Sequence, residues 1–343
     1  MVITTPNARQ KHDSIESKNN QHLPIVNPNN GIIIESMKTQ GSEPKQHFTP
    51  NVYAIGESLL DIIFSDNDMV SAKPGGSMLN ACISLGRLGH QVHFLTEFGN
   101  DKAGDRISAF LKENNVNSKF SVRHEGHKTT LALAWLDKSG NASYSFYQDL
   151  PEEAPEIQIP DFKANDILLF GSFYSIRQRN RINITKLLDS AVKAGATVLY
   201  DPNIRTSKFQ DTIETRQLIF EHINKANIVK GSDEDFAYIY QTSDQADIFR
   251  QLQQRGALFF LTSGKRGVEV VHEEKVTHHE IPAIVPVSTI GAGDNFNAGI
   301  IHALISNQFS KPYSPESISS MANEGIKLAV EVCLRTENYI ARR

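Results

Sequence analysis

Short apolar segments of strand-forming residues alternate with segments of helical periodicity from residue 51 onward. The apolar segments are residues 52–56, 92–99, 166–172, 196–203, 227–232 and 257–264. The helical segments are residues 77–89, 101–114, 178–194 and 244–254. A strand needs nearly continuous apolarity when helices cover both faces of its sheet. The alternation therefore predicts an α/β fold, with a mostly parallel sheet flanked by helices.

Two stretches, at about 60–73 and 120–150, break this alternation. The second contains KTTLALAWLDKSGNASYSFYQ (128–148), which has strand residues on both sides of an Asp-Lys-Ser-Gly turn and no helix between them. These stretches predict a small β-sheet appended to the α/β body, in a position suited to a lid.

The first 47 residues differ in composition from the rest. They are rich in Asn, Gln, Ser, Lys and Pro, and their one short apolar run is Ile32–Ile34. Such a segment cannot bury enough apolar surface to offset the entropy lost on ordering. We predict a disordered polar extension over 1–47 and a single folded domain over 48–343. An upstream start that precedes a functional one, such as Met37, is the alternative.

The charge and the cysteine content exclude several classes of protein. Lys and Arg number 35 against 39 Asp and Glu, which gives a formal net charge of −4 and argues against nucleic acid or an anionic membrane as a partner. No apolar run approaches the ~18 residues of a membrane span, and the first residues lack the apolar region of a secretory signal. Two cysteines, Cys82 and Cys333, cannot build a disulfide framework. We expect a cytoplasmic protein.

The motif PVSTIGAGDNFNAGIIHALI (286–305) carries the clearest chemistry. Gly291, Ala292 and Gly293 precede apolar residues at helical spacing, so they lie at a helix N-terminus, where free N–H groups form an anion site. Asp294 on the first turn could take a proton from a hydroxyl while those amides stabilise a transferring phosphoryl group. Neither the Walker A nor the GxGxxG pattern is present.

A second motif, KPGGSMLNACISLGRLG (73–89), also places glycines before a helical segment. Gly75 and Gly76 would let a ligand approach the backbone, and Asn80 can both donate and accept hydrogen bonds. Asp61, just upstream, is an acceptor suited to a polyol. Two further candidates follow. Tyr147 in the lid stretch could face the sugar, and Arg205 in DPNIR could bind a phosphate or a substrate oxygen.

The two motifs together resemble the PfkB (ribokinase-like) carbohydrate kinases. The resemblance extends over about 51–335 and includes four intermediate segments: GESLLD, DPNIR, KGSDEDF and TSGKRGV. It implies a doubly wound sheet with a β-sheet lid, and an enzyme that uses ATP and Mg²⁺ to phosphorylate a sugar hydroxyl. Asp294 would be the general base and Gly291–Gly293 the anion hole.

The resemblance also implies roles for residues that the motifs alone do not assign. Sugar contacts would come from Asp61, Gly75, Gly76 and Asn80. Nucleotide contacts would come from Ser232, Gly264 and Asn323. Asp235 would hold the metal through water.

Three positions depart from the family pattern. Ser232 and Asp235 stand where the family commonly has Asn and Glu, and the shorter acid has less reach. Ser288 stands where the family usually has an Asp that helps to hold a monovalent cation. A neutral hydroxyl holds such an ion less well, so we expect little or no dependence on potassium.

Within the family, the lid and DPNIR segments look most like fructokinases and 2-keto-3-deoxygluconate kinases. Gln148 stands where kinases of the acidic sugar often carry an Arg, and loss of a charge-assisted partner costs a carboxylate ligand about 1.5–3 kcal/mol. We therefore predict a fructokinase. The alternatives are a 2-keto-3-deoxygluconate kinase, another sugar or nucleoside kinase of the family, and a non-catalytic sugar-binding protein. An exposed β lid also suggests a homodimer that pairs through the lid.

Overall fold

The computed structural model describes residues 49–65, 68–136, 142–204 and 212–343. The predicted polar extension over 1–47 and Arg205 lie outside these residues.

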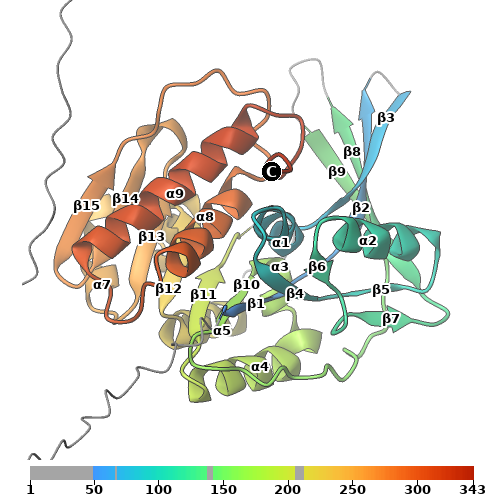
Figure 1. Cartoon of the computed structure of the whole chain (residues 1–343), viewed down its shortest axis with the longest axis horizontal. Coiled ribbons are helices and arrows are strands. Elements are labelled where there is room, and N and C mark those ends of the chain that lie inside the picture. Colours follow the sequence, from blue (N-terminus) through green and yellow to red (C-terminus); the bar gives the residue numbers. More distant parts are fainter. Residues whose placement is uncertain (1–48, 66–67, 137–141, 205–211) are drawn as a thin grey trace, which may run out of the picture. The chain divides into compact units, whose positions relative to one another are not determined.

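The described residues form one large sheet and two smaller ones (Figure 1). The strands of the large sheet are, in spatial order, β15 (Lys275–His279), β14 (Val268–His272), β13 (Leu258–Thr262), β12 (Ile228–Ser232), β11 (Thr197–Asp201), β10 (Ile167–Gly171), β1 (Asn51–Ile55), β4 (Gln91–Leu95) and β6 (Val116–Asn117). Neighbouring strands from β13 to β6 are parallel, while β14 and β15 extend the edge as antiparallel strands.

The chain changes direction across the sheet at β1. From β1 it adds β4 and then β6 on one side, and it returns to place β10, β11, β12 and β13 in sequence on the other. In doubly wound sheets, ligands bind beyond the carboxyl ends of the strands at this reversal. The carboxyl ends of β1, β10, β11 and β12 are therefore where the fold favours a site.

Alternate residues of the strands are buried on opposite faces of the sheet. In β1, Val52 and Ala54 belong to one apolar core and Tyr53 and Ile55 to the other. The first core is closed by α1 (Ser77–Arg87), α2 (Lys102–Glu113), α8 (Ala292–Ser306) and α9 (Pro315–Cys333). The second is closed by α3 (Ser172–Ile176), α4 (Arg181–Lys193), α5 (Ile213–Lys225), α6 (Asp233–Tyr240) and α7 (Gln245–Gln253). Because helices cover both faces of the sheet, residues on both faces of a strand are apolar, and the strand sequences are continuous apolar runs.

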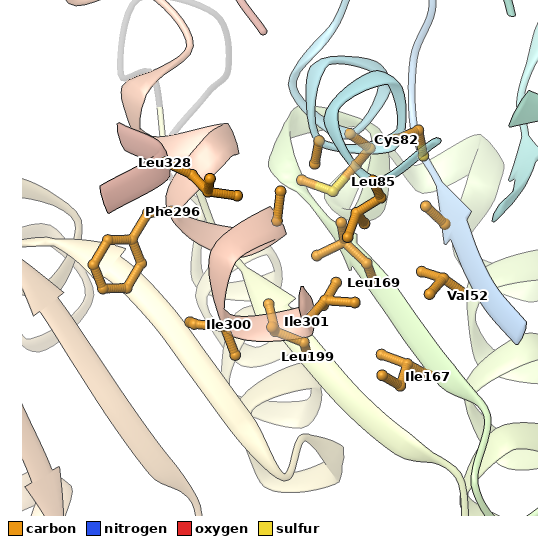
Figure 2. Close-up of a cluster of buried hydrophobic side chains, with 14 of the residues drawn as sticks. Val52, Cys82, Leu85, Ile167, Leu169, Leu199, Phe296, Ile300, Ile301 and Leu328 are labelled. Atoms are coloured by element: carbon orange, nitrogen blue, oxygen red, sulfur yellow. The ribbon is translucent and has the colours of Figure 1, made fainter. Parts of the chain in front are cut away.

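The first core joins α1 to α8 over the centre of the sheet (Figure 2). Leu85 on α1 and Ile301 on α8 both point toward Leu169 on β10. Cys82 is fully buried in this core, and burial raises the pKa of its thiol, so it packs as an apolar residue. This packing holds the N-terminal ends of α1 and α8 in a fixed relation.

The lid is a four-stranded sheet. The term lid is kept for the small sheet that the sequence predicted as a lid, and its strand order is β3 (Asp68–Gly75), β2 (Leu59–Ser65), β8 (Lys128–Leu136) and β9 (Ala142–Asp149). The stretch at 120–127 is not part of it, because β7 (Val122–His124) pairs with β5 (Glu97–Gly99) in a separate two-stranded sheet. The apolar run at 92–99, expected as one strand, is therefore divided between β4 and β5.

Among the residues described, no helix combines the length and the apolarity needed to cross a membrane.

Candidate active site

Asp294 connects the two motifs, although they lie at opposite ends of the folded chain. Its carboxylate accepts a hydrogen bond from Ser77 Oγ at 2.6 Å and another from Asn80 Nδ2 at 2.8 Å. Ser77 and Asn80 belong to the first turn of α1, and Asp294 belongs to the first turn of α8. The carboxylate thus has each of its oxygens fixed by a different side chain of α1.

Burial raises the pKa of the Asp294 carboxyl above its ordinary value. The hydrogen bonds from Asn80 and Ser77 act in the opposite direction, the charge of Asp201 adds to the rise, and Lys230 opposes it. A carboxylate whose pKa is raised is a stronger base than a solvent-exposed aspartate. Burial thus favours proton acceptance at this position.

The glycine loop before Asp294 forms the end of α8. Gly291 is the residue before the helix and has a left-handed backbone (φ 84°), a conformation that glycine adopts without strain. The first N–H groups of a helix have no partner inside the helix. At this helix end the N–H of Ala292 donates to the carbonyl oxygen of Thr289 at 3.3 Å, and the remaining N–H groups together with the positive end of the helix dipole suit an anion.

The predicted sugar-binding residues lie on the strands and turn that lead into α1. Gly75 ends β3 opposite Leu59 of β2, and a Cβ atom at Gly75 would overlap the Asp61 carboxylate. Asn80 is buried, and its Oδ1 atom has no hydrogen-bond partner within the described residues. An unpaired buried acceptor beside Asp294 is suited to a substrate hydroxyl.

The structure does not bring Tyr147 to this group. Tyr147 lies opposite Leu131, whereas Asp61 and Phe146 both lie opposite Ala132, so Tyr147 is on the other face of the lid. Its side chain is 59% exposed. Gln148 shares the face of Asp61 and accepts a hydrogen bond from Arg177 Nη2 at 3.1 Å. A cation is therefore present beside Gln148, which the sequence did not indicate.

A buried ionic group that sequence reasoning missed lies beneath the glycine loop. Lys230 Nζ is 3.1 Å from Asp201 Oδ2, and Asn297 Nδ2 donates to the same oxygen at 2.6 Å. A Cβ atom on Gly293 would lie 2.7 Å from Lys230 Nζ. Burial disfavours the charge on Lys230, but Asp201, Asp235 and Asp294 outweigh it and raise the pKa of the ammonium. Lys230 therefore stays protonated and holds its ammonium group under the glycine loop, with Asp201 as its counter-ion.

A charged residue in an apolar strand was the signal that could have revealed Lys230. It stands in the run NIVKGS, where burial requires a partner of opposite charge. Ser77 gave no comparable signal.

The predicted nucleotide-binding residues lie on neighbouring strand ends and on α9. Ser232 ends β12, and Gly264 follows β13 with a left-handed backbone (φ 54°). Asn323 is exposed on α9 and interacts with His279 on β15.

Asp235 stabilises the start of α6. Its Oδ1 atom accepts from the backbone N–H of Ile204 at 2.6 Å, and its Oδ2 atom accepts from the N–H of Ser232 at 2.7 Å. Within the described residues, no three acidic, His or Cys side chains form a metal-binding group. Mg²⁺ often takes only one or two carboxylates and keeps several waters. A single buried carboxylate that is already hydrogen-bonded fits a role through water.

A doubly wound sheet with a small appended β-sheet and a partly buried aspartate at a glycine-initiated helix defines the ribokinase-like class of small-molecule kinases. Residues 50–333 match the family described as pfkB family carbohydrate kinase, and the chain belongs to this family. Membership confirms the predicted fold and the predicted enzyme class, an ATP-dependent carbohydrate kinase.

Several relatives with curated names are fructokinases. The fructokinase of Salmonella typhimurium is 27% identical over 260 residues, which cover 75% of this chain and 85% of the relative. Probable fructokinase-2 of Arabidopsis thaliana is 26% identical over 270 residues, which cover 75% of this chain and 82% of the relative.

Solved structures support the fold. A fructokinase double mutant from Vibrio cholerae O395, bound to fructose, ADP and potassium, superposes with a TM-score of 0.76 at 20% identity, and the match covers 84% of this chain and 94% of that one. The aminoimidazole riboside kinase of Salmonella enterica, bound to its riboside and an ATP analogue, gives a TM-score of 0.74 at 20% identity, with 85% and 96% covered.

Proposed function

We propose that this chain phosphorylates fructose with ATP and that Asp294 is the general base. The observation that carries the proposal is the pair of hydrogen bonds that joins Asp294 at the start of α8 to Ser77 and Asn80 at the start of α1. These bonds hold the carboxylate between the motif at 73–89, which suits a sugar, and the motif at 286–305, which suits a phosphate.

In this mechanism Asp294 takes the proton from a sugar hydroxyl as the hydroxyl oxygen attacks the terminal phosphorus of ATP. The bond from that phosphorus to ADP breaks, and ADP leaves. The backbone N–H groups of Gly291, Ala292 and Gly293 stabilise the charge on the transferring group. Lys230, beneath the loop, adds a positive charge that does not need to be reorganised during the reaction.

The sugar is held by Asp61, Gly75, Gly76 and Asn80, with Asn80 Oδ1 as the acceptor of a second hydroxyl. Ser232, Gly264 and Asn323 are proposed to contact the nucleotide, and Asp235 to hold Mg²⁺ through water. When bound, Mg²⁺ would neutralise charge on the phosphates of ATP. Arg205 as a clamp, the homodimer through the lid and the cytoplasmic location stay predictions.

Fructose is preferred on two grounds. The curated relatives are named fructokinases at 25–27% identity, and Gln148 supplies no charge for a sugar acid. One observation favours 2-keto-3-deoxygluconate instead, because Arg177 lies 3.1 Å from Gln148 and could pair with a carboxylate.

A substrate panel tests the proposal. ADP release would be measured with fructose, ribose, 2-keto-3-deoxygluconate, tagatose 6-phosphate and adenosine, and we expect the highest kcat/KM for fructose. A higher value for the sugar acid would favour the second candidate. Binding of sugar without turnover of any compound would favour a sugar-binding protein.

We also expect activity to depend little on potassium. Ser288 Oγ accepts from the N–H of Ile290 at 3.2 Å, and a hydroxyl at this position brings no negative charge. Potassium chloride would be titrated against tetramethylammonium chloride at constant ionic strength, which separates ion binding from screening. We expect shallow or no activation, and the Ser288→Asp variant should create or sharpen the dependence. Saturating, several-fold activation of the wild type at low millimolar potassium would contradict the role given to Ser288.

A further inference from the structure

A cavity of about 510 Å³ is lined by residues of β3, α1, α2 and the segment that follows α9. Within the described part of the chain, its charged lining residues are Lys73, Arg87, Arg106, Arg335, Glu337 and Arg342. The described lining includes none of the residues proposed to contact sugar or nucleotide.

Cationic residues outnumber acidic ones in this lining, and the ion pairs around the cavity do not neutralise the excess positive charge. Glu337 is shared, since its Oε2 atom lies 3.2 Å from Arg335 Nη2 and 3.7 Å from Arg87 Nη1. Arg106 has one partner outside the cavity, Glu113 at 3.5 Å, and both side chains are half exposed. Arg342 has no ion pair among the residues described. The excess positive charge is therefore available to a ligand.

Two of the arginines show that the cavity is organised rather than a chance surface cluster. Arg87 donates to Asn114 Oδ1 at 2.8 Å and to the carbonyl oxygen of Ile340 at 2.5 Å, and its guanidinium lies 4.5 Å from the Tyr339 ring centroid. Arg335 has a buried Nε–H without a partner in the described structure. An unsatisfied buried donor in a cationic cavity favours an anionic acceptor.

The lining also has an aromatic part. The rings of Phe110 and Tyr339 both line the cavity, with their centroids 5.4 Å apart. Arginine forks match the oxygen geometry of phosphate, and aromatic rings pack against the carbon part of a ligand. The cations come from β3, α1, α2 and the segment after α9, so the several oxygen atoms of a phosphate or diphosphate group can bridge them.

The segment after α9 also reaches the catalytic loop. Asn295, the residue after Asp294, donates through Nδ2 to the carbonyl oxygens of Gly291 at 2.7 Å and Asn338 at 2.8 Å. Asn338 lies between two cavity residues, Glu337 and Tyr339. Anything that fixes this segment therefore acts on the backbone that carries the proposed anion hole.

We propose that this cavity is a second binding site, which takes a small phosphorylated organic anion. Because the segment from Arg335 to Arg342 contributes both to the cavity and to the support of Gly291, occupancy of the cavity stabilises the loop at Asp294. The proposal goes beyond the phosphorylation of a sugar and does not depend on the identity of that sugar.

Inorganic pyrophosphate is the probe for this site, used on the full chain without divalent metal. Calorimetry would be carried out on the wild type, on Arg106→Gln/Arg342→Gln, and on the control Arg250→Gln, an exposed arginine of α7 paired with Asp247 at 3.0 Å. Sodium chloride would match the ionic strength. We expect the affinity at the cavity to fall on the order of tenfold for each arginine removed, as loss of a charge-assisted bond implies, and to be unchanged in the control.

Thermal unfolding gives a second readout. Pyrophosphate should raise the Tm of the wild type and of the control more than that of the double variant, because a ligand of the folded state stabilises it. Any pyrophosphate bound near Asp294 is common to all three proteins and cancels in the comparison. Equal affinity in the double variant and the wild type would overturn the proposal, as would an equal loss in Arg250→Gln.

Discussion

Replacement of Asp294 by asparagine is expected to lower kcat by ~10²–10⁴-fold, the usual contribution of a general base. The asparagine keeps the shape and the position of the side chain between Ser77 and Asn80 but cannot accept the proton. The affinities for sugar and ATP should change far less than kcat. Steady-state kinetics combined with direct binding measurements would separate the two effects.

The dependence of activity on pH adds a second test of the same residue. Burial raises the pKa of Asp294, and only the ionised form accepts a proton. As the pH falls through this raised pKa, kcat/KM of the wild type should decrease, with a midpoint above the ordinary aspartate value of 3.8. The asparagine variant should lack this decrease of kcat/KM at low pH.

Asp105→Asn is the matched control, because Asp105 is also an acidic residue in the first turn of its helix but is exposed on α2. Its kinetics should equal those of the wild type. Near-normal turnover of Asp294→Asn would exclude the proposed mechanism. A desolvated carboxylate with a raised pKa also opposes folding above that pKa, so the variant should be at least as stable as the wild type at neutral pH.

Replacement of Lys230 by methionine should have the largest effect on stability. The Lys230 side chain is 6% exposed and that of Asp201 is fully buried, so the substitution leaves a buried carboxylate without its cation. Breaking a buried pair in this way typically costs about 3–5 kcal/mol. Urea unfolding would measure the loss.

The double variant Lys230→Met/Asp201→Asn tests the cause of that loss, since it also removes the uncompensated charge. We expect it to recover much of the unfolding free energy. Lys225→Met is the surface control, because Lys225 pairs with Asp189 at 2.5 Å with both side chains partly exposed, and such pairs contribute about 0–1 kcal/mol. If Lys230→Met cost no more than Lys225→Met, the buried pair would not stabilise the fold.

Lys230→Met should also change the pH profile in any protein that remains folded. The charge of Lys230 lowers the pKa of Asp294, so its removal should raise that pKa further. The acid limb of kcat/KM would then move to higher pH. A loss of stability alone would leave the midpoint in place.

The motifs predicted much of the fold and the centre of the site because their chemistry is local. Glycines followed by helical spacing favour a helix N-terminus, and the two helix ends that the motifs predicted meet at Asp294. Continuous apolar runs likewise predicted strands covered on both faces, and α1 and α8 on one face with α4 and α5 on the other confirm it.

The sequence could not predict which face of a sheet a strand residue points to, or which strand lies beside it. Alternation along β9 separates Tyr147 from Phe146, but it does not say which of them faces the body of the protein. The partner of Lys230 is set by the neighbouring strand β11, whose end brings Asp201 alongside. The run at 92–99 is divided into two strands because β5 pairs with β7, and no residue within the run indicates that pairing.

The bond between Ser77 and Asp294 joins positions 217 residues apart, and this separation has a consequence during synthesis. A ribosome that adds about 5–20 residues per second needs roughly 10–40 s to pass from one position to the other. Throughout that interval α1 exists without α8, and Leu79 and Ile83 lack part of the core that covers them in the finished protein. A nascent chain of this kind has the helix end that donates hydrogen bonds to Asp294 but not Asp294 itself. On the proposed mechanism it cannot turn over substrate, so catalysis begins as a single late event.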